Sequence, residues 1–221
     1  MSTPRHQVWD VPTRVFHWAI VLIVLAQWCS AEWNLLAMEW HFRLGYAALA
    51  LVLFRIAWGF VGSESARFSN FVRGPEAVAR YLPQLLARQP QALAGHNPLG
   101  GWSVLLLLAL LLAQSLTGLF SSDDISLFGP LAERVSVDTA GAMTGWHKDL
   151  TDALVIMIGV HLLAVAWHGL FKREDLTRAM FTGSKALPEP PQLQFAGAGR
   201  AALVMAVCAA IVWAVVAFGP R

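Results

Sequence analysis

Continuous apolar stretches, separated by shorter polar segments, recur along the whole chain. Five of them reach the roughly 20 residues that a helix needs to cross a bilayer. They occupy residues 16–36, 42–62, 102–120, 150–171 and 201–219. The apolar residues run on without alternation, and hydrocarbon leaves no backbone group unpaired, so we expect helices rather than strands. The pattern therefore predicts an all-α membrane protein with five spanning helices.

The polar segments between these stretches are of two kinds. Residues 74–88 mix apolar and charged side chains, which predicts a short amphipathic helix lying on the membrane surface. Residues 187–192 are rich in proline and predict a linker before the last span.

Composition agrees with a lipid environment. Of the 221 residues, 57% are hydrophobic and 14% are charged, whereas soluble proteins carry about 25% charged residues. We therefore expect membrane lipid as a partner, and no nucleic acid. The two cysteines, Cys29 and Cys208, form no C-x-x-C pattern, which excludes zinc ribbons and haem attached covalently through C-x-x-C-H.

The distribution of basic residues predicts the orientation of the spans. Eleven Lys and Arg residues lie in the N-terminal segment and in residues 63–101 and 172–200, against four in the segments on the opposite side. Cytoplasmic loops are enriched in basic residues, so we expect the N-terminus in the cytoplasm. Five spans then place the C-terminus on the outer side.

The spacing of histidines within the spans suggests paired metal ligands. His147 and His161 are fourteen residues apart, so a helix places them on one side, separated by about 21 Å along its axis. At matching depths, His41 pairs with His147 near the outer side, and His17 pairs with a histidine low on the fourth span, either His161 or His168. Imidazole is a common axial ligand of haem iron, and two such ligands per iron leave no open position. This arrangement favours electron transfer.

The second span repeats the same interval. Arg55 lies fourteen residues after His41, and Gly59 fourteen after Gly45. Arg55 is expected at the depth of the inner haem, where a propionate would pair with its guanidinium, although it could instead extend to the inner surface. The two glycines could leave room for the macrocycle or serve close contacts between helices.

Several motifs in order resemble the bacterial cytochrome b561 family, which includes hydrogenase b-type cytochrome subunits. The resemblance covers residues 5–182. It is carried by VWDVPTRVFHW at residues 8–18, FRLGY at 42–46, RIAWGFVG at 55–62, RFSNFVRGP at 67–75, HNPLGG at 96–101, and HLLA at 161–164 followed by His168.

That resemblance implies a four-helix transmembrane bundle holding two b haems in the bacterial inner membrane. It assigns His17 and His161 to the inner haem and His41 and His147 to the outer haem, which leaves His168 beside a ligand. It also implies respiratory electron transfer with quinone. The domains expected are the bundle at residues 5–182, a linker at 183–198 and an extra C-terminal helix at 199–221. On the third span, Gln114, Ser115 and Thr117 could serve helix contacts or a quinone headgroup.

Three functions compete for this pattern. The first is an electron conduit between the quinone pool and a periplasmic redox protein such as a cytochrome c or a hydrogenase. The second is an enzyme that oxidises a small reductant such as superoxide at the outer haem, with quinone as acceptor. The third, a non-redox transporter or scaffold, leaves the fourteen-residue histidine spacing unexplained.

Charge on the outer side separates the first two functions. The outer segments carry eight acidic against four basic residues, and a negative face repels superoxide and attracts a basic protein. The loop at residues 121–145 contributes most, and Arg43 and Lys148 beside the outer histidines could still guide a small anion. The acidic residues of that loop are Asp123, Asp124, Glu133 and Asp138, against Arg134.

Overall fold

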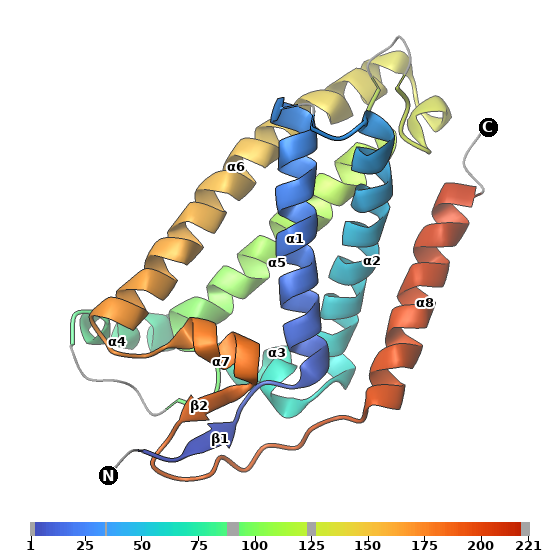
Figure 1. Ribbon diagram of the computed structural model, residues 1–221. Coiled ribbons are helices and arrows are strands. Elements are labelled where there is room, and N and C mark those ends of the chain that lie inside the picture. Colours follow the sequence, from blue (N-terminus) through green and yellow to red (C-terminus); the bar gives the residue numbers. More distant parts are fainter. Residues whose placement is uncertain (1–2, 34, 88–92, 123–126, 218–221) are drawn as a thin grey trace.

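The computed structural model describes residues 3–33, 35–87, 93–122 and 127–217, and its core is a set of long helices. Within these residues, five helices are long and apolar enough to cross a membrane, as the sequence predicted (Figure 1). They are α1 (Val11–Trp33), α2 (Met38–Val61), α5 (Pro98–Phe120), α6 (Val137–Leu170) and α8 (Ala198–Ala217).

Helix α2 is the centre of the bundle. It packs against α1, α5 and α8, whereas α6 packs mainly against α5. Accordingly, 39% of the apolar window of α2 is buried inside the protein, against 11% for α6. The main core joins Val52 and Trp58 of α2 to Phe16 of α1, Leu108 of α5 and Cys208 of α8. Most of the α6 surface therefore lies outside the protein core.

The two ends of the bundle differ in construction, and we name them by their content. The cap end carries the short elements, and the loop end carries residues 127–136 (Figure 1). The cap-end elements are β1 (Arg5–Gln7), the 3-10 turn η1 (Glu64–Ala66), α3 (Phe68–Phe71), α4 (Pro75–Leu85), α7 (Leu176–Thr182) and β2 (Ser184–Ala186). At the loop end a second 3-10 turn, η2, spans Ala132–Arg134.

Two of the cap-end elements bear on the sequence predictions. Helix α4 confirms an amphipathic helix within residues 74–88, of which residue 88 lies outside the described part. Its place on the membrane surface stays a prediction. Strands β1 and β2 were not predicted, and they pair antiparallel with Arg5 opposite Ala186. The expected linker at residues 183–198 thus begins with a strand. Beside this pair, Val8 and Trp9 are buried against Ala179 and Leu187.

Capping residues explain where α5 and α6 begin. The Asn97 side chain accepts a hydrogen bond of 2.7 Å from the Gly100 amide, with Pro98 in the first turn of α5. Ser136 caps α6 by accepting from the Thr139 amide at 3.2 Å. Helix α6 therefore starts at Val137. The sequence predicted a start at residue 150, because the first turns of this helix are too polar to appear as an apolar stretch.

Candidate functional site

At the loop end, two histidines from different helices face each other. The ring centroids of His41 on α2 and His147 on α6 are 6.2 Å apart, with an angle of 73° between the ring planes. Imidazole nitrogens bind metal ions at about 2 Å, so two rings on opposite sides of one ion have centroids on the order of 6 Å apart. The spacing therefore fits a pair of axial ligands on one iron.

Hydrogen bonds fix which nitrogen of each ring is available. The Ser30 hydroxyl donates to the Gln27 carbonyl at 2.7 Å and so accepts from His41 Nδ1 at 3.0 Å. On the facing helix, His147 Nδ1 donates to the Gln114 carbonyl at 2.9 Å. With both Nδ1 atoms donating, both Nε2 atoms keep a lone pair for a metal, as is usual for ligating histidines.

Helix α5 supplies the support of His147, through residues that the sequence could not assign. The Thr117 hydroxyl lies 3.2 Å from His147 Nδ1, and the Gln114 side-chain amide lies 3.2 Å from His147 Nε2. A Cβ at Gly118 would come within 3.0 Å of the His147 ring. Gln114 and Thr117 thus serve a helix contact here, and the Gln114 amide would have to turn away when Nε2 binds a metal.

At the cap end, His17 on α1 and His161 on α6 are close enough to interact electrostatically. The Nδ1 atom of His17 is buried and has no hydrogen-bond partner. Within the described residues, His161 also makes no hydrogen bond. Buried polar groups are nearly always satisfied, so two histidines with unused nitrogens are suited to an additional binding partner.

His168 differs from His161 in this respect. It is 5% exposed, and its Nδ1 donates to the Ala164 carbonyl at 2.9 Å. Its Nε2 lies 3.4 Å from the Tyr81 hydroxyl and 3.3 Å from the Asn97 side-chain amide. Both ring nitrogens of His168 are therefore occupied by protein groups, which favours His161 as the partner of His17.

Arg55 is buried at the same end and does not extend to the surface. The residue is 3% exposed, and its Nη1 atom has no hydrogen-bond partner. Its guanidinium carbon lies 5.4 Å from the centroid of the Phe68 ring and 5.9 Å from that of Phe71. An unpaired buried charge costs on the order of several kcal/mol, so the site as built calls for an anionic partner.

The two glycines expected near the macrocycle have different surroundings. A Cβ at Gly59 would lie 2.1 Å from the Phe68 ring. Close packing of α3 on α2 thus requires a residue without a side chain at this position, and a role of Gly59 beside a haem stays a prediction. Gly45 faces the side-chain nitrogen of Gln27, 3.4 Å from where a Cβ would stand, and its role beside a haem stays a prediction.

His96, in the turn before α5, lies near Arg55, His17 and His161 at the cap end. Its sequence position alone did not assign it a role. Its ring packs against Trp9 and Phe71, with centroid distances of 4.7 and 4.6 Å. Burial, and then the charges of Arg55, His161, Lys185 and His17, lower the pKa of His96 to about 3. Its Nδ1 atom is buried without a partner.

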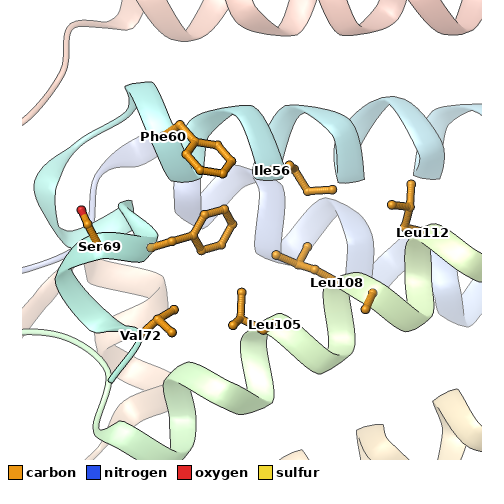
Figure 2. Close-up of a pocket in the computed structure, with 9 residues that line it drawn as sticks. Ile56, Phe60, Ser69, Val72, Leu105, Leu108 and Leu112 are labelled. Atoms are coloured by element: carbon orange, nitrogen blue, oxygen red, sulfur yellow. The ribbon is translucent and has the colours of Figure 1, made fainter. Parts of the chain in front are cut away.

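The open groove on the outside of the bundle is a separate feature. A groove of about 620 Å³ lies between α2, α3 and α5, and Figure 2 shows Ile56, Phe60 and Leu112 on its walls. Apart from Ser69 its lining is apolar, and none of the histidines contributes to it.

Among the described residues no group of three or more His, Cys, Asp or Glu side chains could hold a metal ion. A haem needs at most two protein ligands, so a pair of histidines would be enough for one.

Comparison with known proteins gives one family. Residues 8–183 match the family described as prokaryotic cytochrome b561. The chain is 25% identical to a probable Ni/Fe-hydrogenase B-type cytochrome subunit of Rhizobium leguminosarum bv. viciae, over 80% of this chain and 87% of that protein. A protein of the same description from Bradyrhizobium diazoefficiens is 26% identical, over 84% of this chain and 87% of its own length.

Another relative has a different description. A probable superoxide oxidase CybB of Yersinia pestis is 25% identical, over 74% of this chain and 90% of that protein. No solved structure matches the chain. The family match spans most of the residues and includes all four spans that carry or support the histidine pairs. The chain is thus a multi-pass helical membrane protein that belongs to the prokaryotic cytochrome b561 family.

Proposed function

We propose that this protein carries electrons across the bacterial inner membrane through two bis-histidine b haems, between the quinone pool and a periplasmic redox protein such as a cytochrome c or a hydrogenase. Membership of the cytochrome b561 family, and the b-type cytochrome description of its relatives, support membrane electron transfer and haem b. That the protein binds two haems, and that quinone and a periplasmic protein are its redox partners, is what we propose beyond this support.

One observation carries it: His41 and His147 face each other at 6.2 Å with both Nδ1 atoms donating to protein oxygens. These two residues would hold the loop-end haem. His17 and His161 would hold the cap-end haem, since His161 is the member of the α6 pair with unused nitrogens. The two sites lie about 21 Å apart along α6.

A bis-imidazole haem supplies a one-electron carrier without an open iron position. The chain's own residues would hold and surround it. Ser30 and the Gln114 carbonyl keep the loop-end imidazoles in one tautomer and orientation. Arg55 at the cap end would pair with a propionate through its unpartnered Nη1. Because two histidines per iron would leave no open coordination position, the residues favour transfer of electrons over binding of a gas.

The basic residues support one orientation of the protein in the membrane. We infer that the cap end lies in the cytoplasm and the loop end in the periplasm, because the cap-end segments hold most of the Lys and Arg. The loop-end haem would then exchange electrons with the periplasmic partner. Of the acidic residues proposed to attract it, Glu133 lies in η2 and Asp138 in the first turn of α6, whereas Asp123 and Asp124 lie outside the described residues.

The haem content of the purified protein tests this proposal. The expected ratio is two haems per chain, and acid–acetone should extract both, because no C-x-x-C pattern is present to attach them. A His41→Ala, His147→Ala double variant is the matched control, and it should retain one. A ratio of one in the unaltered protein, or haem that remains with the chain after extraction, would contradict the proposal.

Superoxide oxidation is the second candidate, and the similarity to the probable superoxide oxidase of Yersinia pestis favours it. Arg43 and Lys148 beside the loop-end histidines would guide the anion. Arg43, however, is already paired with Glu39. Superoxide consumption by the purified protein with quinone as acceptor tests this function. Rapid consumption of superoxide that slows in a Lys148→Gln variant, together with little electron transfer to basic cytochromes, would favour superoxide oxidation over electron transfer to a periplasmic protein.

A further inference from the structure

Among the buried cap-end nitrogen atoms that have no hydrogen-bond partner, two belong to neighbouring side chains. They are Nη1 of Arg55 and Nδ1 of His96. Both side chains lie against the same ring, Phe71: the Arg55 guanidinium carbon is 5.9 Å from its centroid, and the His96 centroid is 4.6 Å from it. The charge of Arg55 also acts directly on His96. A histidine nitrogen that can carry the ring hydrogen, beside a buried cation without a bonded partner, is complementary to a carboxylate.

The nearest acidic residue does not fill this role. Asp10 interacts electrostatically with Arg55, but both of its oxygens already accept hydrogen bonds. Oδ1 accepts from the Thr13 amide at 2.8 Å, and Oδ2 accepts from Trp58 Nε1 at 2.9 Å. Within the described residues, Arg55 makes no hydrogen bond or ion pair. Asp10 therefore offsets part of the buried charge without occupying the donors.

The surroundings of His96 hold its ring in place. Trp9 and Phe71 pack on it. The following residue, Asn97, caps α5 and contacts His168 through its side chain. The backbone carrying His96 is thus tied both to the start of α5 and to the last turns of α6. A residue fixed in this way beside the proposed cap-end haem is suited to recognising one group of that haem.

We infer that Arg55 and His96 together bind one carboxylate, and that this carboxylate is a propionate of the cap-end haem. The inference rests on the proposed function, and its new element is His96. Arg55 contributes charge and a hydrogen bond, and His96 contributes a hydrogen bond from a neutral ring. The lowered pKa of His96 agrees with that neutral form at physiological pH. Such bonds near a haem are one of the protein's means of setting its reduction potential.

Substitution of His96 tests the inference through the reduction potential of the cap-end haem. His96→Leu removes the donor, whereas His96→Gln keeps an N–H group of similar reach. His6→Leu is the matched control, because His6 lies in β1 and does not act on His96. Comparison with His161→Ala, which should retain only the loop-end haem, assigns the two potentials.

We expect all three variants, His96→Leu, His96→Gln and His6→Leu, to retain two haems. The cap-end potential should fall in His96→Leu, because a propionate with fewer donors leaves more negative charge near the iron. It should return most of the way in His96→Gln and stay unchanged in His6→Leu, while the loop-end potential stays the same throughout. An unchanged cap-end potential in His96→Leu, or equal shifts in His96→Leu and His96→Gln, would overturn the inference.

A second arm identifies the source of the carboxylate. The protein is reconstituted with haem whose propionates are methyl esters, and the effect of His96→Leu on the potential should then disappear. An effect that persists with esterified haem, or that depends on added phosphate or anionic lipid, would assign the donors to another anion and overturn the propionate. Failure of the proposed function itself is distinguishable, since it would appear as a haem-to-protein ratio other than two in the unaltered protein.

Discussion

The two histidine sites are built from different kinds of neighbours. At the loop end, neutral groups of α1 and α5 hold His41 and His147, and the Nδ1 atoms of both rings are satisfied. At the cap end, Nη1 of the buried Arg55 and three buried histidine nitrogens have no partner among the described residues. The loop-end imidazoles are thus held by neutral protein groups, whereas the cap end contains a buried cation without a bonded partner.

The sites also differ in how the ends are closed. At the cap end, the Trp18 ring of α1 stacks on Phe181 of α7 at 4.1 Å, and the Arg14 guanidinium donates to the Phe181 carbonyl. Strands β1 and β2 lie against the same region. At the loop end the described residues provide only η2 and an isolated bridge between Ser122 and Phe128. The comparison suggests that the cap-end site is enclosed and that its charged neighbours set the haem reduction potential. The loop-end site is more open and suited to electron exchange with a partner.

Removal of a ligand has the largest expected effect. His147→Ala should lower the haem-to-protein ratio from two to one and leave the cap-end haem in place. His161→Ala should do the same at the other site. His168→Ala is the control, because both of its nitrogens already bind protein groups, and it should keep two haems. Loss of a haem from His168→Ala and not from His161→Ala would exchange their roles.

Crowding of the loop-end ligand should have a smaller effect. Gly118→Val places methyl groups where a Cβ alone would lie 3.0 Å from the His147 ring, so the ring must tilt. We expect weaker retention of the loop-end haem and a changed electron paramagnetic resonance signal for that haem alone. Gly159→Val on α6 is the control, since nothing lies within 4 Å of its Cβ position. Equal haem loss in both variants would point to a general effect on the helices.

Neutralising the buried cation should change a potential rather than the haem content. Arg55→Met replaces the charged arginine side chain by an unbranched apolar one. The cap-end potential should fall, because positive charge near the iron favours the reduced form, and the loop-end potential should stay constant in redox titration. The proposed electrostatic difference between the two sites would be contradicted if both potentials changed equally, or if Arg55→Met left the cap-end potential unchanged.

The surface charge of the loop end should give the smallest effect. Replacing Asp123, Asp124 and Glu133 by their amides should slow oxidation by a basic cytochrome several-fold at low salt, because electrostatic steering weakens. At high salt the rates should converge, since exposed charges are screened over about 10 Å at 0.1 M. Stopped-flow measurements at two ionic strengths check this, with an unchanged haem spectrum as the control. Identical oxidation rates for the variant and the unaltered protein at low salt would contradict a basic redox partner.

The sequence predicted the elements that depend on one helix and missed those that depend on several. Apolar runs gave all five spans, and the fourteen-residue interval brought attention to His147 and His161. The interval could not separate His161 from His168, because that distinction depends on Tyr81 and Asn97, which lie far away in the chain. Likewise, Gly118 and the unpartnered Nδ1 of His96 become visible only when α5 is placed beside its neighbours.

The pairing of β1 with β2 has a consequence for biogenesis. Arg5 bonds to Ser184, 179 positions later, so the cap end cannot close until almost the whole four-helix region has been made. At a synthesis rate of about 5–20 residues per second, the delay is on the order of ten to forty seconds. During that time α1 and α2 can enter the membrane while His17 still lacks His161. A bound cofactor at the cap end would therefore be enclosed late, after the loop-end pair had already formed.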